Sequence, residues 1–381
     1  MGTAYTPGLK VSSDTLIQKT RRLPLKGTVL VNVGDSVDPT TVVARTELPG
    51  PMQTIKLAEK MGVEPSEVRS ALRVSVGDNV REGDLLAQTK GLFGWFKSEF
   101  RSPITGTIEM LSEQTGHLGI RVPPTPVEKD AYIRGVVKEV IPEEGVIVEC
   151  RGALVQGIFG VGGERQGKIA VAVDGADAAL TDALITPEHN GSILVGGSSV
   201  TAAALRRAAQ VGAAAIVVGG IVDRDLIDYL REALSDPGFD IGVAITGHEP
   251  IPFTLVVTEG FGSIRMAKRT FELMQSLDGS FASVNGATQI RAGVIRPEVI
   301  APSDSGGQAS VADTQSSDLV LGTYIRVIRE PYFGQLGHVT ALPPELRQIE
   351  SETHVRVLQA RLEDGRDVTV PRANVEIIQA A

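Results

Sequence analysis

Two loops that contain glycine and serine are the residues of this sequence best suited to hold an anion. One follows the apolar run at 193–195 and the other follows the apolar run at 254–258, and each precedes a helical pattern. Unpaired backbone N–H groups at the start of a helix favour a phosphate or a carboxylate. The alternative is that these residues only form the turns between strands and helices. The candidate anion-binding residues are Gly196, Gly197, Ser198, Ser199, Gly260, Gly262 and Ser263.

The sequence contains no motif for catalysis or for a cofactor. Neither GxxxxGK[ST] nor GxSxG occurs, and neither loop is a GxGxxG after a first strand. The five His residues show no HxH or HExxH spacing, and the single cysteine, Cys150, excludes a cysteine-based zinc site. We therefore predict no catalytic residue, no cofactor and no metal.

The aromatic run GLFGWFK, residues 91–97, is the first candidate for binding a protein partner. It holds the only Trp of a chain that is 4% aromatic. As an exposed tip, Phe93, Trp95 and Phe96 with Lys97 would form an apolar anchor with a neighbouring charge. The alternative is that the rings fold back and cap a core.

Two segments that precede this run repeat one pattern. Residues 24–37 and 74–87 alternate β-branched with polar side chains and contain Gly-Asp pairs, and residues 132–148 give a weaker version. The pattern predicts short strands joined by tight turns. We expect the repeats to close into one small sandwich, since neither half buries its apolar face alone.

The order VxVGDxV, GDLLA, SPxxGTI over residues 24–122 resembles the biotinyl/lipoyl carriers and their relatives, the barrel-sandwich hybrids. Trp95 stands where carriers have the modified Lys, and Lys97 is out of register. The resemblance therefore implies a hybrid domain without a carried group, as in RnfC-type subunits. We place it at 23–166, after a flexible tail at 1–22 and with a helical insertion at 50–72.

Apolar strands alternate with helical patterns over 167–300, which predicts an α/β domain with a largely parallel sheet. Such a domain places its binding loops at the carboxyl ends of its strands. Residues 301–318, rich in Ser, Gly, Ala and Asp, predict a flexible linker.

The tail at 319–381 predicts a compact β unit. Its residues 325–328, 331–334 and 337–339 resemble the KOW motif of SH3-like barrels, which contact RNA, RNA polymerase or other proteins. Seven Arg against eight acidic residues give the tail a net charge of −1. Nucleic-acid binding needs a surplus of positive charge, so the tail favours a protein contact over RNA. Its candidate contact residues are Arg326, Arg329, Tyr332 and Phe333.

The whole chain has 381 residues, a net charge of −9 and 42% hydrophobic residues, as ordinary multidomain proteins do. It has no apolar run long enough to span a membrane and no apolar segment typical of a signal peptide, so we expect a cytoplasmic protein without membrane insertion.

The leading hypothesis is a non-enzymatic scaffold or adaptor that acts through protein-binding surfaces. A first alternative is an enzyme subunit that binds a phosphorylated or anionic ligand in the α/β domain. A second is a KOW-type factor associated with transcription or translation.

Overall fold

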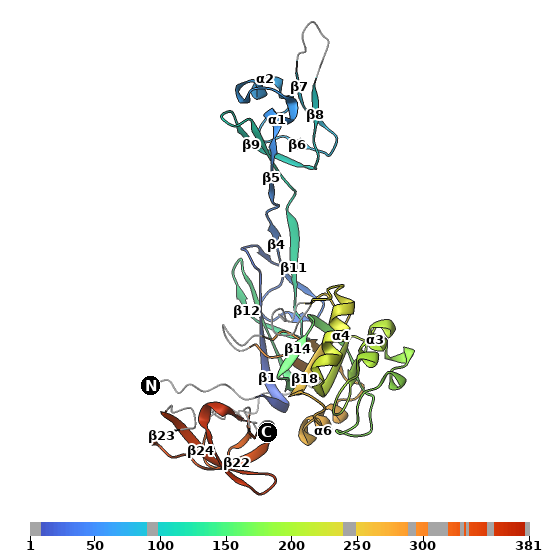
Figure 1. Ribbon diagram of the computed structural model, residues 1–381, viewed down its shortest axis with the longest axis vertical. Helices are drawn as coiled ribbons and strands as arrows, with labels where there is room; N and C mark the ends of the chain where they lie inside the picture. The colour runs from blue at the N-terminus through green and yellow to red at the C-terminus, as the bar shows by residue number, and fades with distance from the viewer. Residues whose placement is uncertain are drawn as a thin grey trace.

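The computed structural model describes residues 9–89, 98–238, 249–288, 295–303, 319–327, 331–332, 335–348 and 354–377. The chain is mostly β and is arranged along one long axis (Figure 1). A head, residues 52–121, stands at one end, and a stalk of two long strands joins it to a body, residues 9–41 and 131–303. A C-terminal sheet, residues 319–377, lies beside the body at the other end (Figure 1).

The body is built on one mixed sheet of eleven strands. Strands β15 to β18 are parallel to one another, and the remaining pairs are antiparallel. The order is β14 (Phe159–Val161), β18 (Thr254–Phe261), β17 (Ala215–Ile221), β16 (Ile193–Val195), β15 (Glu164–Val171), β19 (Phe281–Asn285), β20 (Glu298–Pro302), β13 (Gly145–Gln156), β12 (Gly135–Ile141) and β3 (Ser36–Val37), with β1 (Val11–Arg22) paired to β13.

Three helices connect the parallel strands to one another and to β19. They are α3 (Ala202–Val211), α4 (Asp223–Ala233) and α6 (Lys268–Ser276), and two short 3-10 turns, Asp182–Leu184 and Pro187–His189, precede β16. Helix α3 begins where the Thr201 hydroxyl accepts a hydrogen bond from the Ala204 N–H, and it ends at Gly212. This glycine has φ +80°, a conformation that side chains disfavour.

The head has its own sheet and its own core. The sheet order is β5 (Met52–Lys56), β10 (His117–Arg121), β9 (Gly106–Ser112), β6 (Asn79–Val80), and a separate hairpin pairs β7 (Leu85–Gln88) with β8 (Glu99–Arg101). Helix α1 (Leu57–Met61), the 3-10 turn Pro65–Glu67 and helix α2 (Val68–Ala71) cover the sheet. The core includes Leu57, Val68, Leu86 and Leu118, all fully buried.

The stalk consists of β4 (Val42–Leu48) and β11 (Thr125–Asp130), which pair in antiparallel register from Thr125 opposite Leu48 down to Asp130 opposite Val42. A short strand, β2 (Thr28–Val29), pairs with the base of β4. Above the stalk, residues 49–51 and 122–124 form a neck that continues into β5 and β10 of the head (Figure 1).

The C-terminal sheet is antiparallel and has a separate apolar core. Its strands are β21 (Tyr324–Val327), β22 (Leu336–Ala341), β23 (Leu346–Gln348), β24 (His354–Leu362), β25 (Asp367–Pro371) and β26 (Val375–Ile377), with a 3-10 turn at Arg372–Asn374.

The Gly-Asp turns predicted from the repeats are present. Gly34, Gly77 and Gly83 have φ +91°, +99° and +89°. In each turn the following Asp accepts a hydrogen bond of 2.7 Å from the backbone N–H three residues earlier. However, the two strong repeats lie in different units, because Val37 packs in the core at the base of the stalk and Val80 packs in the head. The single sandwich expected at 23–166 is thus divided between head and body.

The expected flexible tail at 1–22 is wrong for residues 11–22, which form β1 along the whole length of β13. The apolar alternation of this strand is weak, with Leu16 54% exposed and Ile17 buried. Near the end of this strand, the side chain of Arg21 is buried and forms an ion pair with Glu164. The alternation of apolar and polar residues in the sequence does not indicate such a pair.

Three further boundaries differ from the prediction. Within the predicted helical insertion, residues 52–56 form strand β5. Strand β15 crosses the predicted boundary at 166/167, so the predicted α/β domain shares one sheet with strands before it. At the start of the predicted linker, Ala301 and Pro302 belong to β20 and Ser303 bonds to Arg151, while residues 304–318 lie outside the described residues.

Candidate functional site

The two loops predicted to bind an anion meet at the carboxyl ends of β16 and β18. The hydroxyl oxygens of Ser199 and Ser263 are 3.5 Å apart, which shows that the loops lie side by side. Both Ser198 and Ser199 are buried. The structure therefore brings the two candidate loops together.

Four backbone N–H groups of these loops already donate hydrogen bonds within the protein. Gly197 and Ser198 both donate to the Ala178 carbonyl, at 3.0 and 2.9 Å. Gly196 donates to Val217 and Gly262 to Ile221, at 2.9 and 2.7 Å. At the start of α3, the Asp225 carboxylate accepts from Ala202 at 3.4 Å, which places a negative charge where an anion would bind. The geometry fits the alternative interpretation, in which these residues form turns.

Close backbone packing explains why glycine is needed here. A Cβ atom at Gly197 would lie 2.4 Å from the Gly175 carbonyl oxygen and 2.5 Å from that of Ala178. The segment around residues 174–180 thus packs directly on the end of β16, in the space that an anion would need.

A buried ion pair joins the C-terminal sheet to the same edge of the body. Arg326 of β21 donates from Nη1 to Oε2 of Glu259, at the end of β18, over 2.6 Å. Both side chains are less than 10% exposed, at 6% and 9%. The other carboxylate oxygen, Oε1, accepts from the Ala267 N–H at the start of α6, at 3.0 Å. Arg326, predicted to contact a partner, is instead enclosed within the chain.

Tyr332, the second described residue of the predicted tail surface, is half-buried. The guanidinium of Arg366 lies 5.7 Å from its ring centroid, and Arg366 also pairs with Asp364 at 2.5 Å. Arg329 and Phe333 lie outside the described residues, as do Phe93, Trp95, Phe96 and Lys97.

A polar cluster around the buried Arg21, at the base of the stalk, was not anticipated from the sequence. Arg21 of β1 forms a bidentate pair with Glu164 of β15, with both hydrogen bonds at 2.6 Å, and donates from Nε to the Asp130 carbonyl at the end of β11. The guanidinium of Arg21 also lies 5.2 Å from the ring centroid of Tyr132, just beyond the stalk.

Tyr132 extends this cluster to β20. Its hydroxyl donates to Glu298 at 3.3 Å, and Glu298 pairs with Lys19 at 2.5 Å. Complete burial, reinforced by the charge of Glu298, raises the pKa of Tyr132 well above its ordinary value. Its backbone has φ +70°, which is uncommon for an aromatic residue. The unusual backbone and the ion pairs together fix the stalk to the body.

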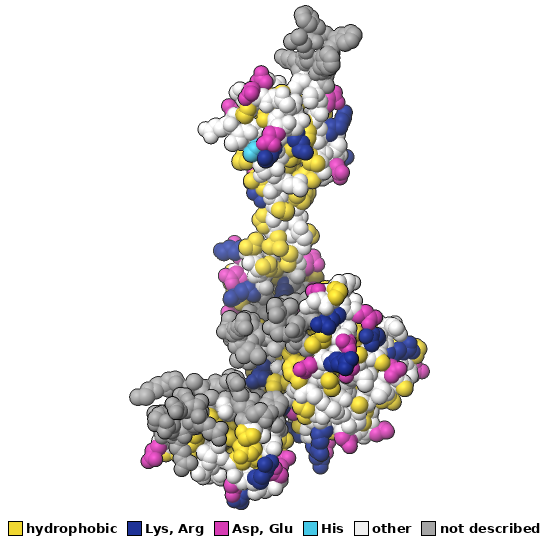
Figure 2. All heavy atoms as spheres, viewed as in Figure 1, with side chains coloured by type: hydrophobic (Ala, Val, Ile, Leu, Met, Phe, Trp, Pro, Cys, Tyr) yellow, Lys and Arg dark blue, Asp and Glu magenta, His cyan; other side chains and the backbone are white. Residues whose placement is uncertain are grey.

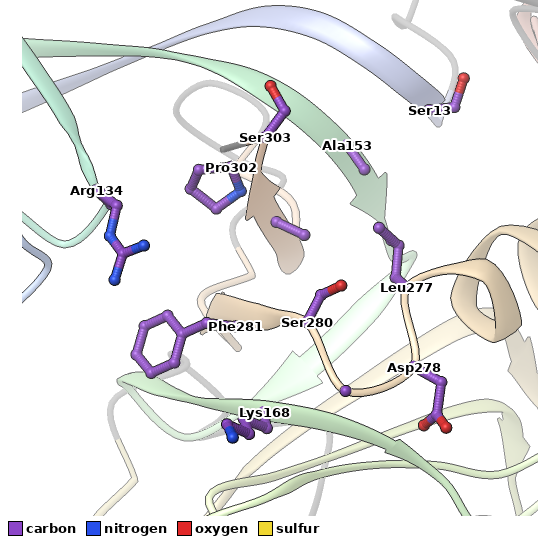
Figure 3. A pocket seen from close by; sticks show the side chains of 12 residues that line it. Ser13, Arg134, Ala153, Lys168, Leu277, Asp278, Ser280, Phe281, Pro302 and Ser303 are labelled. Carbon is purple, nitrogen blue, oxygen red and sulfur yellow. The ribbon is translucent and has the colours of Figure 1, made fainter. Parts of the chain in front are cut away.

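A cavity of about 590 Å³ opens on the body beside strands β19 and β20 (Figure 3). Its lining includes Arg134, Lys168, Phe281, Pro302 and Ser303, with the turn Leu277 to Ser280 along one side. The guanidinium of Arg134 lies 5.9 Å from the ring centroid of Phe281. The cavity therefore combines an aromatic wall with two cationic side chains.

Metal-binding side chains do not cluster in the part of the chain that the structure describes: no group of three or more His, Cys, Asp or Glu residues there could hold an ion. Burial raises the pKa of the Cys150 thiol to about 11, so at neutral pH this residue is a protonated thiol packed beside the stalk base. Of the helices that the structure describes, none has the length and hydropathy to cross a membrane.

No protein-family model matches the chain. No curated protein is significantly similar to it in sequence.

Proposed function

We propose that this protein is a non-enzymatic adaptor whose head contacts a protein partner at a distance from the body. The observation that carries the proposal is the stalk, which holds a separately packed head away from the body along the long axis (Figure 1). A second core at the end of a two-stranded ribbon contributes nothing to the packing of the body sheet. Its position suits recognition of another molecule.

The neck and the adjoining face of the head supply an apolar surface. Figure 2 shows apolar side chains gathered between head and body. Pro49, Pro51, Pro123 and Pro124 are exposed at the neck. On the head, Met52 and Met110 are 41% and 38% exposed.

Gly119 lies between these two methionines. A Cβ atom at Gly119 would meet the Met52 sulfur at 3.0 Å and Met110 Cβ at 3.3 Å. Both methionine side chains therefore border one shallow surface, and exposed methionine adapts well to the shape of a partner. Exposed apolar patches on soluble proteins commonly mark interaction sites.

Contacts at the base of the stalk fix the orientation of the stalk relative to the body. The buried Arg21 and Tyr132, with Glu164 at the surface, form the cluster that anchors the end of β11 to β1 and β15. A surface whose orientation is fixed in advance loses less entropy when it binds.

We retain two resemblances within this proposal. The shared Gly-Asp turns of head and body support a relation to the barrel-sandwich hybrids, and the antiparallel C-terminal sheet supports a relation to KOW-type SH3-like barrels. We propose a cytoplasmic location because the single, buried Cys150 suits a compartment that keeps thiols reduced.

Site-specific photo-crosslinking in cells of the native source tests the proposal. A benzophenone amino acid at position 110 should give a discrete adduct of higher mass with a protein partner. The matched control places the same amino acid at position 222, where Val222 is 41% exposed on the body, close to the 38% of Met110. Adducts of equal yield at both positions, or none at position 110, would contradict the adaptor proposal.

A further inference from the structure

The cavity in Figure 3 contains a cation, Lys168, for which no ion pair is present among the described residues. Within the described residues, no carboxylate lies within ion-pair distance of the exposed ammonium of Lys168. The one carboxylate that lines the cavity, Asp278, accepts a hydrogen bond from the Val171 N–H at 2.9 Å. Arg134, at the rim, pairs with Asp38 at 3.1 Å. The positive charge at Lys168 is thus available to an anion that enters the cavity.

Strand register places an aromatic ring beside this charge. Lys168 of β15 lies directly opposite Phe281 of β19, so both side chains project from the same face of the sheet. The ring of Phe281 is 39% exposed. Pro302 of β20 lies opposite Gly152 of β13 and also lines the cavity. The ring and the proline form an apolar wall close to the ammonium.

We infer that this cavity binds a small organic anion, with a planar ring packed on Phe281 and its phosphate or carboxylate paired with Lys168. The volume of about 590 Å³ is in the range of small-molecule sites, roughly 300–1,000 Å³. The inference concerns the body and does not depend on the head or its partner.

Titration of the full chain with simple probes, followed by NMR, tests each part of this recognition. Phenyl phosphate and benzoate supply the ring with the two kinds of anion. Phenol supplies the ring without the charge, and inorganic phosphate supplies the charge without the ring. We expect saturable binding of phenyl phosphate or benzoate, with a Kd on the order of 1 mM or tighter, and much weaker binding of phenol and inorganic phosphate. The stronger of the two ring-bearing anions identifies the acidic group.

Variants connect this binding to the cavity. Lys168→Gln should weaken binding of the ring-bearing anion by about tenfold, because it removes a charge-assisted hydrogen bond. Phe281→Leu should reduce the preference for phenyl phosphate over inorganic phosphate. Lys60→Gln makes the same change of charge at an exposed site on the head and should leave binding unchanged. Thermal unfolding of each variant confirms that it is folded.

Three results would overturn the inference. The first is the absence of saturable binding of either ring-bearing anion below about 10 mM, which is weaker than specific recognition requires. The second is an equal loss of binding in Lys168→Gln and Lys60→Gln, which would indicate a general charge effect. The third is binding of phenol as tight as that of phenyl phosphate, which would leave Lys168 without a role.

Discussion

The buried pair formed by Glu259 and Arg326 joins the C-terminal sheet to the body. Two charges removed from water are stable only when each satisfies the other, and here the Ala267 N–H adds a further bond to the carboxylate. This pair therefore holds the tail at the carboxyl end of β18, on the side of the parallel sheet where α/β proteins commonly bind ligands.

Glu259→Gln should lower the free energy of unfolding by about 3–5 kcal/mol, because a buried guanidinium loses its counter-charge while the shape is kept. Urea denaturation measures the loss. Asp367→Asn, which removes the partner of Arg361 in an exposed pair of the same sheet, is the control and should change stability little. A loss for Glu259→Gln no greater than for this control would show that the two units do not depend on the buried pair.

Among the elements, the neck decides how firmly the head is held. It has few cross-strand hydrogen bonds because four of its six residues are prolines, which have no N–H. Val122 donates to the Pro51 carbonyl at 3.1 Å, and Arg121 donates to the Gly50 carbonyl at 2.8 Å. Close backbone contact between the two segments of the neck at Gly50 takes the place of the missing cross-strand hydrogen bonds.

Gly50→Ala should disturb this contact. A Cβ atom at this position would lie 2.0 Å from the Val122 carbonyl oxygen, so the backbone must move. We expect a loss of about 1–3 kcal/mol, as for other overpacked sites, and faster hydrogen exchange in β5 and β10.

The control for this change is Gly163→Ala, where a Cβ atom would meet nothing within 4 Å. It should alter stability by less than about 0.5 kcal/mol. Equal effects of the two substitutions would mean that the neck does not depend on close backbone contact.

On the scale of the whole molecule, the protein is an assembly of separate cores. The head core uses residues from 55 to 120, whereas the two cores of the body and stalk base use none of them. The two strands of the stalk remain paired up to the neck, where Leu48 and Thr125 are direct cross-strand partners. A short turn can therefore replace everything between them.

A chain in which Asn-Gly replaces residues 49–124 should keep the body folded, since this dipeptide forms the turn that suits a two-residue hairpin. Hydrogen exchange followed by mass spectrometry should show unchanged protection in β16, β17 and β18. The full-length chain is the reference. Loss of protection in these strands would mean that the head and body fold as one cooperative unit.

The sequence by itself determined the local structure. Gly-Asp pairs give the turns at residues 34–35 and 77–78, because glycine tolerates positive φ and aspartate bonds to the preceding backbone. Continuous apolar runs give the buried strands β16 and β17, and the spacing of Leu226, Tyr229 and Leu230 gives the buried face of α4. These features depend on residues that are close together in the chain.

Only the tertiary structure decided which elements share a core and which loops have backbone donors left for a ligand. The two similar repeats separate because β4 and β11 pair with each other and carry the second repeat away from the first. The backbone N–H groups of Gly197 and Ser198 in the first candidate anion loop donate to Ala178. Arg326 is enclosed by Glu259, 67 residues earlier in the chain. The cavity between Lys168 and Phe281 depends on the register of strands more than 100 residues apart. Local patterns do not contain such pairings, because burial and charge compensation depend on the residues that the fold brings together.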